Sequence, residues 1–395
     1  MRQPSLRIYF AAAVMAAAAV PAHAQKPQAA THVFDSVLQP LMDSHQLAGA
    51  VVMVSTKDST LNLEPAGYAD LSARKPMRTD AIFWIASMSK PITAAALMML
   101  VDEGKVNVDD PVTKYLPEFK DQWLAVEEDK EHVLLRKPSH PVLVRHILSH
   151  TSGMPATSPM EKPTLDLLRW RAAVLSYAIT PLKTEPGAKY SYSNAGINTA
   201  GRIIEVAGGM PYEEFLQKRL FDPLGMDDTT FWPDEKQLRR LAKSYKVGKD
   251  GGALEEEVVT QLKYPLNDHS RQPMPAGGLF STAADTTRFC QMVLNGGAYK
   301  GRRYLSEAAV KQMTSIQTGD LPQNYGFGWT VLKRAAGDGR SEGSFGHGGA
   351  YKTAMWVDPK KGLVLVLMRQ HAGPDTTKLE PAFVKVAMEK FGAGR

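Results

Sequence analysis

The sequence predicts an α/β (α+β) protein in which one antiparallel sheet is formed by N- and C-terminal strands and is flanked by helices. Short runs rich in valine and leucine occur near both ends of the 395-residue chain, with turn sequences between them. Residues 106–300 instead carry short helical patterns separated by Pro- and Gly-rich joints. We therefore expect a mostly helical region inserted into an α/β scaffold, with a cleft between the two parts as the natural place for a site.

The first elements of the scaffold are a helix and a hairpin. Apolar residues recur at helical spacing over residues 31–45, which predicts a helix. Residues 47–55 and 60–68 have the composition of strands, and Lys57, Asp58 and Ser59 form a turn between them. We expect these two strands to pair with each other.

The C-terminal part mirrors this arrangement. Residues 326–332, 353–357 and 363–368 are predicted strands, with a strong turn at 358–362, and residues 377–391 are a predicted closing helix. The helical patterns of the middle region cover residues 165–177, 197–206, 212–220 and 283–294.

The N-terminus has the pattern of an export signal. Arg2 and Arg7 precede an apolar run over residues 8–20, and Ala22-His23-Ala24 is the small-x-small pattern that signal peptidase cleaves. We expect a signal peptide over residues 1–24 and an exported protein, periplasmic or extracellular, with no stable membrane insertion after cleavage. Residues 25–395 then form one domain, in which 25–105 and 301–395 make the α/β part and 106–300 the helical insertion.

Composition excludes several classes of protein. The 47 basic residues exceed the 41 acidic residues by only 6, and the two kinds are interspersed along the chain. This small surplus does not indicate nucleic-acid binding. The single cysteine, Cys290, allows no internal disulfide, and its apolar helical context predicts a small buried thiol. Nothing in the sequence implies a metal, nucleotide or flavin, so we expect no cofactor. The oligomeric state cannot be read from the sequence.

The chemistry begins with a Ser-x-x-Lys spacing, which occurs twice. Ser72 and Lys75 lie in a predicted surface turn, whereas Ser87 and Lys90 run into Pro91 and a helical pattern that ends near Gly104. Because proline is tolerated in the first turn of a helix, the helix begins close to Ser87. Three residues make about one turn, so the two side chains share a face.

This arrangement suits nucleophilic catalysis. A serine hydroxyl needs a neighbour to take its proton, and a lysine amine does so only when it is neutral. Burial and the positive end of a helix both lower the pKa of a lysine below its ordinary value of about 10.4. Taken alone, Ser87 is better explained as a helix N-cap and Lys90 as an exposed first-turn lysine.

Two further segments favour the catalytic interpretation. Tyr192-Ser193-Asn194 lies in a turn-rich segment that leads into a predicted helix. The Tyr192 phenol can share the serine proton, and the Asn194 amide can bind a substrate carbonyl. Asn194 is also suitable as the cap of that helix. His347 and Gly349 precede a predicted strand, where alternation places both on one face and glycine admits a substrate backbone. His347 is also compatible with a purely structural role.

Together these segments resemble the penicillin-recognising serine hydrolases of the class C β-lactamase type, whose relatives include D-alanyl-D-alanine carboxypeptidases, D-aminopeptidases and esterases. The resemblance covers nearly the whole chain after the leader and includes residues 83–90, 146–154, 277–282 and 358–362. It implies a β-lactamase/transpeptidase-like fold and an acyl-enzyme mechanism. The implied substrate is a small ester, amide or D-peptide.

The resemblance also implies roles for individual residues. Ser87 is the implied nucleophile, Lys90 the base and Tyr192 a member of the proton network. Asn194 would contact the substrate amide or Lys90, and the backbone N–H groups of Ser87 and Ala350 would form an oxyanion hole. His150 belongs to a framework segment of the family and is expected to be structural.

The sequence departs from the family pattern at one place. Where β-lactamases and many penicillin-binding proteins carry Lys-Thr-Gly, this chain has His347-Gly348-Gly349. The lysine of that motif helps to hold a carboxylate, so the departure argues against efficient β-lactamase activity.

Two other functions remain open at this stage. The first is a catalytically inactive relative that binds peptidoglycan or a partner protein, against which the joint presence of Ser87, Lys90 and Tyr192 argues. The second is a metal hydrolase built on His146 and His150, which no further ligand pattern accompanies.

Overall fold

The computed structural model describes residues 32–248, 252–373 and 377–392. The signal peptide predicted at residues 1–24 lies outside these residues. Within them, the structure has no helix that is both long and apolar enough to cross a membrane.

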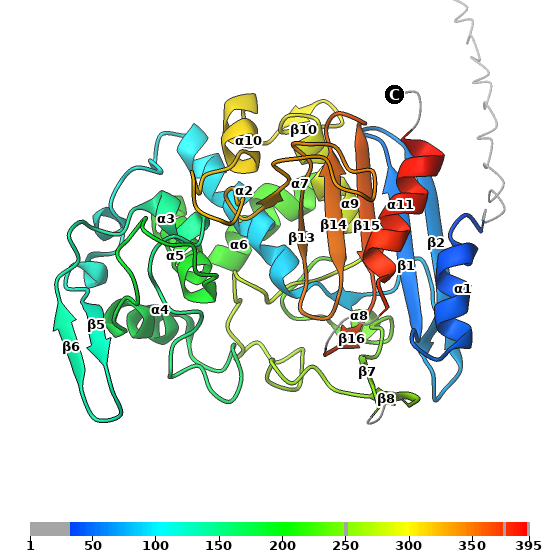
Figure 1. The fold of residues 1–395 in the computed structure, drawn as a ribbon, viewed down its shortest axis with the longest axis horizontal. Coiled ribbons are helices and arrows are strands. Elements are labelled where there is room, and N and C mark those ends of the chain that lie inside the picture. Colours follow the sequence, from blue (N-terminus) through cyan, green and yellow to red (C-terminus); the bar gives the residue numbers. More distant parts are fainter. Residues whose placement is uncertain (1–31, 249–251, 374–376, 393–395) are drawn as a thin grey trace, which may run out of the picture. The chain divides into compact units, whose positions relative to one another are not determined.

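A seven-stranded sheet combines strands from the two ends of the chain, as predicted (Figure 1). Its order is β12-β13-β14-β15-β1-β2-β3, and every neighbouring pair is antiparallel. The N-terminal hairpin and the C-terminal strands meet where β1 pairs with β15. The strands are β1 Gly49–Ser55, β2 Thr60–Asp70, β3 Lys75–Pro76, β12 Thr330–Val331, β13 Phe345–Gly348, β14 Ala354–Asp358 and β15 Leu363–Met368.

Both faces of the sheet are covered, which explains why β1 is buried along its whole length. Ala50, Val52 and Val54 contribute to a core with α1 (Asp35–Asp43) and α11 (Leu379–Phe391). The alternate residues of the same strand, among them Val51 and Met53, belong to the main core, which includes α2 (Ser89–Asp102) and α9 (Ala283–Leu294). Cys290 is buried in α9, as predicted from its context.

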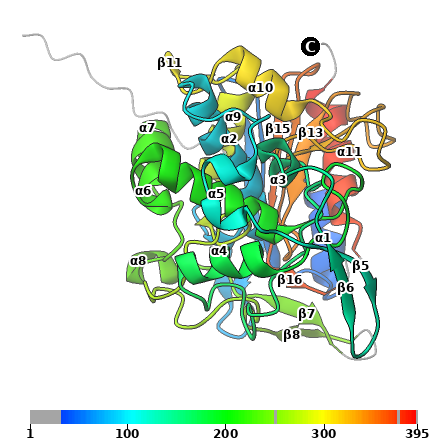
Figure 2. The same ribbon diagram turned by 90° about the vertical axis from the view of Figure 1, so that its left-hand side faces the viewer.

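The middle of the chain is mostly helical and lies beside the sheet (Figures 1 and 2). Although α9 comes from this middle region, it packs on β1, β14 and β15. The other helices are α3 Val144–Leu148, α4 Trp170–Ile179, α5 Asn194–Gly208, α6 Tyr212–Leu216, α7 Asp222–Leu224, α8 Glu235–Leu238 and α10 Glu307–Thr314.

Small β elements surround these helices. A hairpin of β5 and β6 projects beside α4 (Figure 2), and β16 pairs in parallel with β7. These elements are β4 Phe83–Trp84, β5 Leu124–Glu128, β6 Val133–Arg136, β7 Tyr245–Val247, β8 Leu254–Glu256, β9 Phe280–Ser281, β10 Ala298–Tyr299, β11 Arg302–Arg303 and β16 His371–Ala372.

Several predicted elements differ from the observed ones for local physical reasons. The strand expected over 326–332 is reduced to β12, because Gly328 has a φ of 77° that no extended strand uses. The helix expected from residue 165 begins only at Trp170, because Asp166 turns inward to a buried ion pair with Arg271. The strand β13 was not predicted, since its glycines weaken the strand pattern. Gly346 is needed there, because a Cβ at this position would lie 2.4 Å from the Trp356 ring.

Candidate active site

Ser87 lies in a single 3₁₀ turn, Ala86–Met88, that leads directly into α2. Pro91 occupies the first turn of α2, as predicted from its restricted backbone. Ala86, just before the serine, has a φ of 46°, a left-handed conformation that L-residues with a Cβ rarely adopt. This sharp entry holds Ser87 half-exposed at the start of a helix that is otherwise buried.

Lys90 is fully buried and points its amine at Ser87. Its Nζ lies 3.0 Å from the Ser87 Oγ and 2.6 Å from the carbonyl oxygen of Ala276. It also lies 4.6 Å from the centroid of the Tyr192 ring. Burial lowers the pKa of Lys90 well below its ordinary value, because the ammonium form loses its hydration. The amine can therefore accept a proton.

Tyr192 is held over this pair by the start of α5. The Ser193 side chain caps that helix by accepting a hydrogen bond from the Gly196 N–H at 3.0 Å. Burial raises the pKa of Tyr192, although 38% of the residue is exposed, and a hydrogen bond with Ser87 opposes the rise. The structure thus brings Ser87, Lys90 and Tyr192 together, as the sequence predicted.

Asn194 is not the cap of α5, and its expected contact with a substrate amide stays a prediction. Ser193 caps α5, and Asn194 is its first residue. Within the described part of the chain, Asn194 makes no hydrogen bond to Lys90, and its buried Oδ1 has no partner.

His347 lies in β13 itself rather than before a strand, and it is buried. Its Nδ1 lies 2.7 Å from the carbonyl oxygen of Gly348, and its Nε2 lies 2.9 Å from the hydroxyl of Tyr325. Burial, together with the nearby Lys90, lowers the pKa of His347 to about 3, so the ring is neutral. Because a carbonyl only accepts, Nδ1 carries the proton and Tyr325 donates to Nε2.

Tyr325 and His150 complete an aromatic cluster around Tyr192, and sequence reasoning did not assign Tyr325 to the site. The His150 ring centroid lies 4.3 Å from that of Tyr192 and 4.8 Å from that of Tyr325. His150 is buried, and its Nδ1 accepts a hydrogen bond from the Ser193 N–H at 3.1 Å. These contacts fit the structural role expected for His150. No local pattern distinguishes Tyr325 from the other tyrosines.

The turn after β13 lies against the backbone that precedes Ser87. A Cβ on Gly349 would lie 2.6 Å from the carbonyl oxygen of Ile85, so this approach requires glycine. The alternation expected across His347 and Gly349 stops at Gly348, where β13 ends. In the described part of the chain, the N–H groups of Ser87 and Ala350 donate to no other residue.

The metal alternative receives no support from the two histidines that suggested it. His146 Nδ1 accepts a hydrogen bond from the Leu143 N–H at 3.2 Å, and His150 faces the tyrosine cluster. Among the described residues, converging His, Cys, Asp and Glu side chains occur at His32, which precedes α1, at Asp35 of α1 and at Glu64 of β2, and none of these is a predicted site residue.

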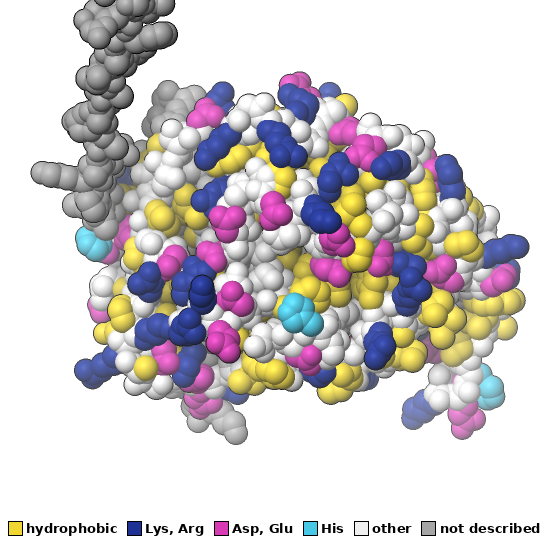
Figure 3. Space-filling view, turned by 180° about the vertical axis from the view of Figure 1, so that it is seen from behind, with side chains coloured by type: hydrophobic (Ala, Val, Ile, Leu, Met, Phe, Trp, Pro, Cys, Tyr) yellow, Lys and Arg dark blue, Asp and Glu magenta, His cyan; other side chains and the backbone are white. Residues whose placement is uncertain are grey.

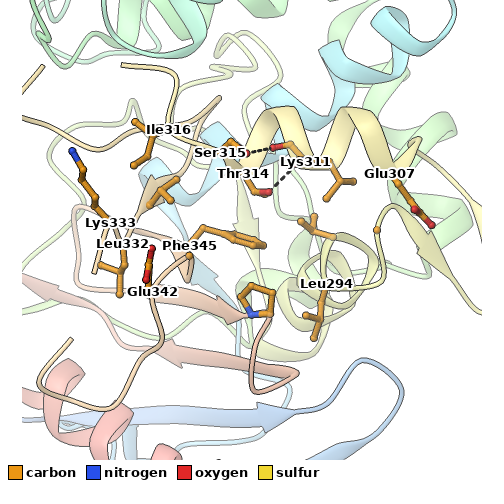
Figure 4. A pocket seen from close by; sticks show the side chains of 16 residues that line it. Leu294, Glu307, Lys311, Thr314, Ser315, Ile316, Leu332, Lys333, Glu342 and Phe345 are labelled. Atoms are coloured by element: carbon orange, nitrogen blue, oxygen red, sulfur yellow. Dashed lines mark hydrogen bonds between the residues drawn. The ribbon is translucent and has the colours of Figure 1, made fainter. Parts of the chain in front are cut away.

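The large cavities lie away from Ser87. A cavity of about 650 Å³ between α9, α10 and β12 is lined by residues such as Leu294, Lys311 and Leu332 (Figure 4), and it includes no predicted site residue. On the face shown in Figure 3, basic and acidic side chains are mixed, so that face has no extended patch of one sign.

Comparison with known proteins identifies relatives that align over most of this chain. The Beta-lactamase family model matches residues 34–387. Protein Rv1367c of Mycobacterium tuberculosis (strain ATCC 25618 / H37Rv) is 32% identical over 374 residues, which cover 86% of this chain and 89% of that protein. Esterase EstB of Burkholderia gladioli is 28% identical over 386 residues, which cover 88% of this chain and 93% of that protein.

A solved structure shares the fold. EstCE1, described as a hydrolase with promiscuous acyltransferase activity, superposes with a TM-score of 0.74 at 23% identity, over 90% of this chain and 97% of that chain. At this identity the likeness speaks for the fold alone.

Proposed function

The chain belongs to the Beta-lactamase family of serine hydrolases, and on that basis we propose that it hydrolyses uncharged esters through an acyl-enzyme on Ser87. The observation that carries this proposal is the buried amine of Lys90, 3.0 Å from the Ser87 Oγ. A buried lysine beside a helix-start serine is the arrangement that serine activation requires.

The proposed reaction has two steps that share the same groups. The Ser87 Oγ attacks the acyl carbonyl while Lys90 takes the hydroxyl proton, and the free N–H groups of Ser87 and Ala350 bind the developing oxyanion. The bond to the alcohol then breaks, and the proton passes to the leaving oxygen through Lys90 and Tyr192. In the second step water attacks the acyl carbonyl with the same amine as base, the bond to the Ser87 Oγ breaks, the proton returns to that oxygen, and the carboxylic acid leaves.

The preference for uncharged esters rests on His347. Its two ring nitrogens are engaged by Gly348 and Tyr325, and its low pKa keeps it without charge. A neutral ring whose nitrogens are both occupied offers a substrate carboxylate neither a charge nor a hydrogen bond. The similarity to Esterase EstB is compatible with an ester substrate. Relatives of nearly equal identity are named Penicillin-binding protein 4* and putative D-alanyl-D-alanine carboxypeptidase, so the preference over a penicillin or a D-peptide rests on His347 alone.

The second Ser-x-x-Lys of the chain provides a control for testing Ser87 as the nucleophile. Wild type, Ser87→Ala and Ser72→Ala are treated with a fluorophosphonate, p-nitrophenyl acetate and benzylpenicillin, and intact mass is measured. Ser72 belongs to the second Ser-x-x-Lys, lies in a turn and bonds to Asp70 at 2.8 Å, so it is a matched control. We expect one adduct in wild type and Ser72→Ala, none in Ser87→Ala, and the slowest reaction with penicillin.

The alternative of an inactive binding relative makes the opposite prediction. If wild type formed no adduct with any of the three reagents, Ser87 would not be activated, and the binding function would be preferred. An adduct that persisted in Ser87→Ala would instead move the nucleophile elsewhere.

We also propose that the protein is exported, from the sequence of residues 1–24 alone. The expected mature protein begins at Gln25, which N-terminal sequencing of protein recovered outside the cytoplasm would identify.

A further inference from the structure

The carbonyl that holds the amine of Lys90 belongs to a segment, residues 274–279, that runs beside α2. We call this segment the strap. Accepting the proposed function, in which Lys90 is the base, we propose that Asn198 is a positioning residue for Lys90 that acts through the strap, by clamping the peptide group between Pro275 and Ala276.

This peptide group is held from both edges. The Ala276 N–H donates to the Oδ1 of Asn198 at 2.9 Å. On the opposite edge, the Pro275 carbonyl lies 2.9 Å from the Thr93 hydroxyl, whose single proton it shares with the Ser89 carbonyl at 3.1 Å, while the Tyr212 hydroxyl lies 2.7 Å from the same oxygen. The next carbonyl along the strap, that of Ala276, accepts from the Nζ of Lys90 at 2.6 Å. The acceptor for Lys90 belongs to the following peptide group, whose Gly277 N–H donates to the Met274 carbonyl at 3.2 Å. The clamp on the Pro275–Ala276 peptide therefore restrains the backbone from which this acceptor projects.

A second network fixes the orientation of the Asn198 side chain. The Nδ2 of Asn198 donates to the Tyr177 hydroxyl at 2.9 Å, and that hydroxyl donates its own proton to Glu161. Since the proton of Tyr177 is committed to the carboxylate, its oxygen can only accept, so the NH₂ of Asn198 must face Tyr177. The Oδ1 of Asn198 is thereby turned toward the strap. Asn198 is fully buried, so no bulk water competes for these bonds.

The hydrogen bond to the Ala276 carbonyl determines the orientation of the Lys90 amine. A neutral amine has two N–H donors and one lone pair. When one N–H is directed at the Ala276 carbonyl, rotation about the last side-chain bond is restricted, and the lone pair can be held toward Ser87. A displacement of reacting groups by about 1 Å can cost on the order of 100-fold in rate, so the position of this carbonyl matters.

Other contacts keep the strap in place when Asn198 is removed. The Trp84 indole donates to the Gly277 carbonyl at 2.7 Å, and the Leu279 N–H donates to the Ser89 hydroxyl at 3.3 Å. We therefore expect the Asn198→Ala variant to fold while its peptide clamp relaxes.

The test measures the second-order rate constant for fluorophosphonate labelling of Ser87, together with kcat and KM for p-nitrophenyl acetate. For Asn198→Ala we expect a labelling rate constant and a kcat about 10- to 100-fold lower, with KM changed less than threefold. Asn198→Asp keeps an oxygen for the Ala276 N–H but loses the NH₂ that faces Tyr177, so it should restore only part of the rate. Thr199→Val is the matched control, because Thr199 is the next buried residue of α5 and bonds only within the helix, to Ala195.

The readout separates positioning from general damage to the fold. A merely structural role would lower the fraction of molecules that react and leave the rate constant of the reactive fraction unchanged. The proposal is overturned if Asn198→Ala labels within twofold of the wild-type rate, or if Thr199→Val is slowed as much. If Asn198→Ala does not fold, Thr93→Val removes the opposite clamp and is expected to slow labelling in the same way, and an unchanged rate in it overturns the proposal. Absence of labelling in wild type would instead refute the proposed function.

Discussion

The Tyr325 hydroxyl lies 2.9 Å from the Nε2 of His347, and it donates to that nitrogen because the Nδ1 of the same ring is committed to the Gly348 carbonyl. A side chain of the protein thus occupies the ring nitrogen through which a histidine at this position would otherwise meet a substrate. This pairing accounts for the uncharged substrate that we propose.

Replacing His347 by lysine should change the substrate preference. We expect His347→Lys to raise the ratio of kcat/KM for a carboxylate-bearing ester to kcat/KM for its methyl ester by about 10-fold or more, because one charge-assisted hydrogen bond supplies about 1.5–3 kcal/mol. Ester hydrolysis is followed with each member of the pair. His347→Gln, which adds no charge, is the control and should leave the ratio unchanged. An unchanged ratio in a folded His347→Lys protein would contradict the proposed preference.

His347 should also make the protein less stable in acid. Its pKa is about 3 in the folded protein and about 6.5 when unfolded, so the unfolded state binds the extra proton between these values. The neutral His347 ring makes its full contribution to the free energy of unfolding above about pH 6.5, and this contribution is lost as the pH falls toward 3. We expect the loss between pH 6.5 and 4.5 to be about 2–3 kcal/mol smaller in His347→Gln, measured by urea unfolding. Equal losses in the two proteins would show that His347 does not stay neutral.

The lowered pKa of the Lys90 amine should determine the pH dependence of turnover. Because burial lowers the pKa of its amine well below 10.5, kcat/KM should rise with pH and level off well below pH 10. Lys90→Arg keeps a positive side chain that does not lose its proton, so we expect a loss of about 100- to 10,000-fold at every pH. The measurement is a profile of ester hydrolysis from pH 5 to 10. A wild-type rise centred near pH 10 would mean that Lys90 is not desolvated.

The ion pair between Asp166 and Arg271 should matter for stability. Its atoms lie 2.7 Å apart, and the two side chains are 0% and 1% exposed. Asp166→Ala leaves a buried guanidinium without its partner, which should lower the free energy of unfolding by about 3–5 kcal/mol. The control is Glu128→Ala, which breaks an exposed pair with Lys183 of the same 2.7 Å length and should cost less than about 1 kcal/mol. Similar losses from the two variants in urea titrations would contradict this ranking.

The sequence predicted the frame of the fold because its signals are local. Strand-like composition on both sides of a turn predicted the hairpin of β1 and β2, and helical spacing predicted α9 with the bounds that the structure has. Pro91 and the helical pattern after it located Ser87 and Lys90 on one face of a helix start. These features depend on neighbours within a few residues, so the order of residues along the chain is sufficient to predict them.

Only the tertiary structure decided how the site is built. The carbonyl that holds Lys90 is 186 residues away in the chain, the clamp of Asn198 on Ala276 spans 78 residues, and Tyr325 meets His347 across 22. A carbonyl has no residue-specific signature, and one tyrosine among 13 is not marked as the partner of a histidine. Such contacts arise when distant segments are packed against each other, and the burial that then lowers the pKa values of Lys90 and His347 exists only in the folded protein.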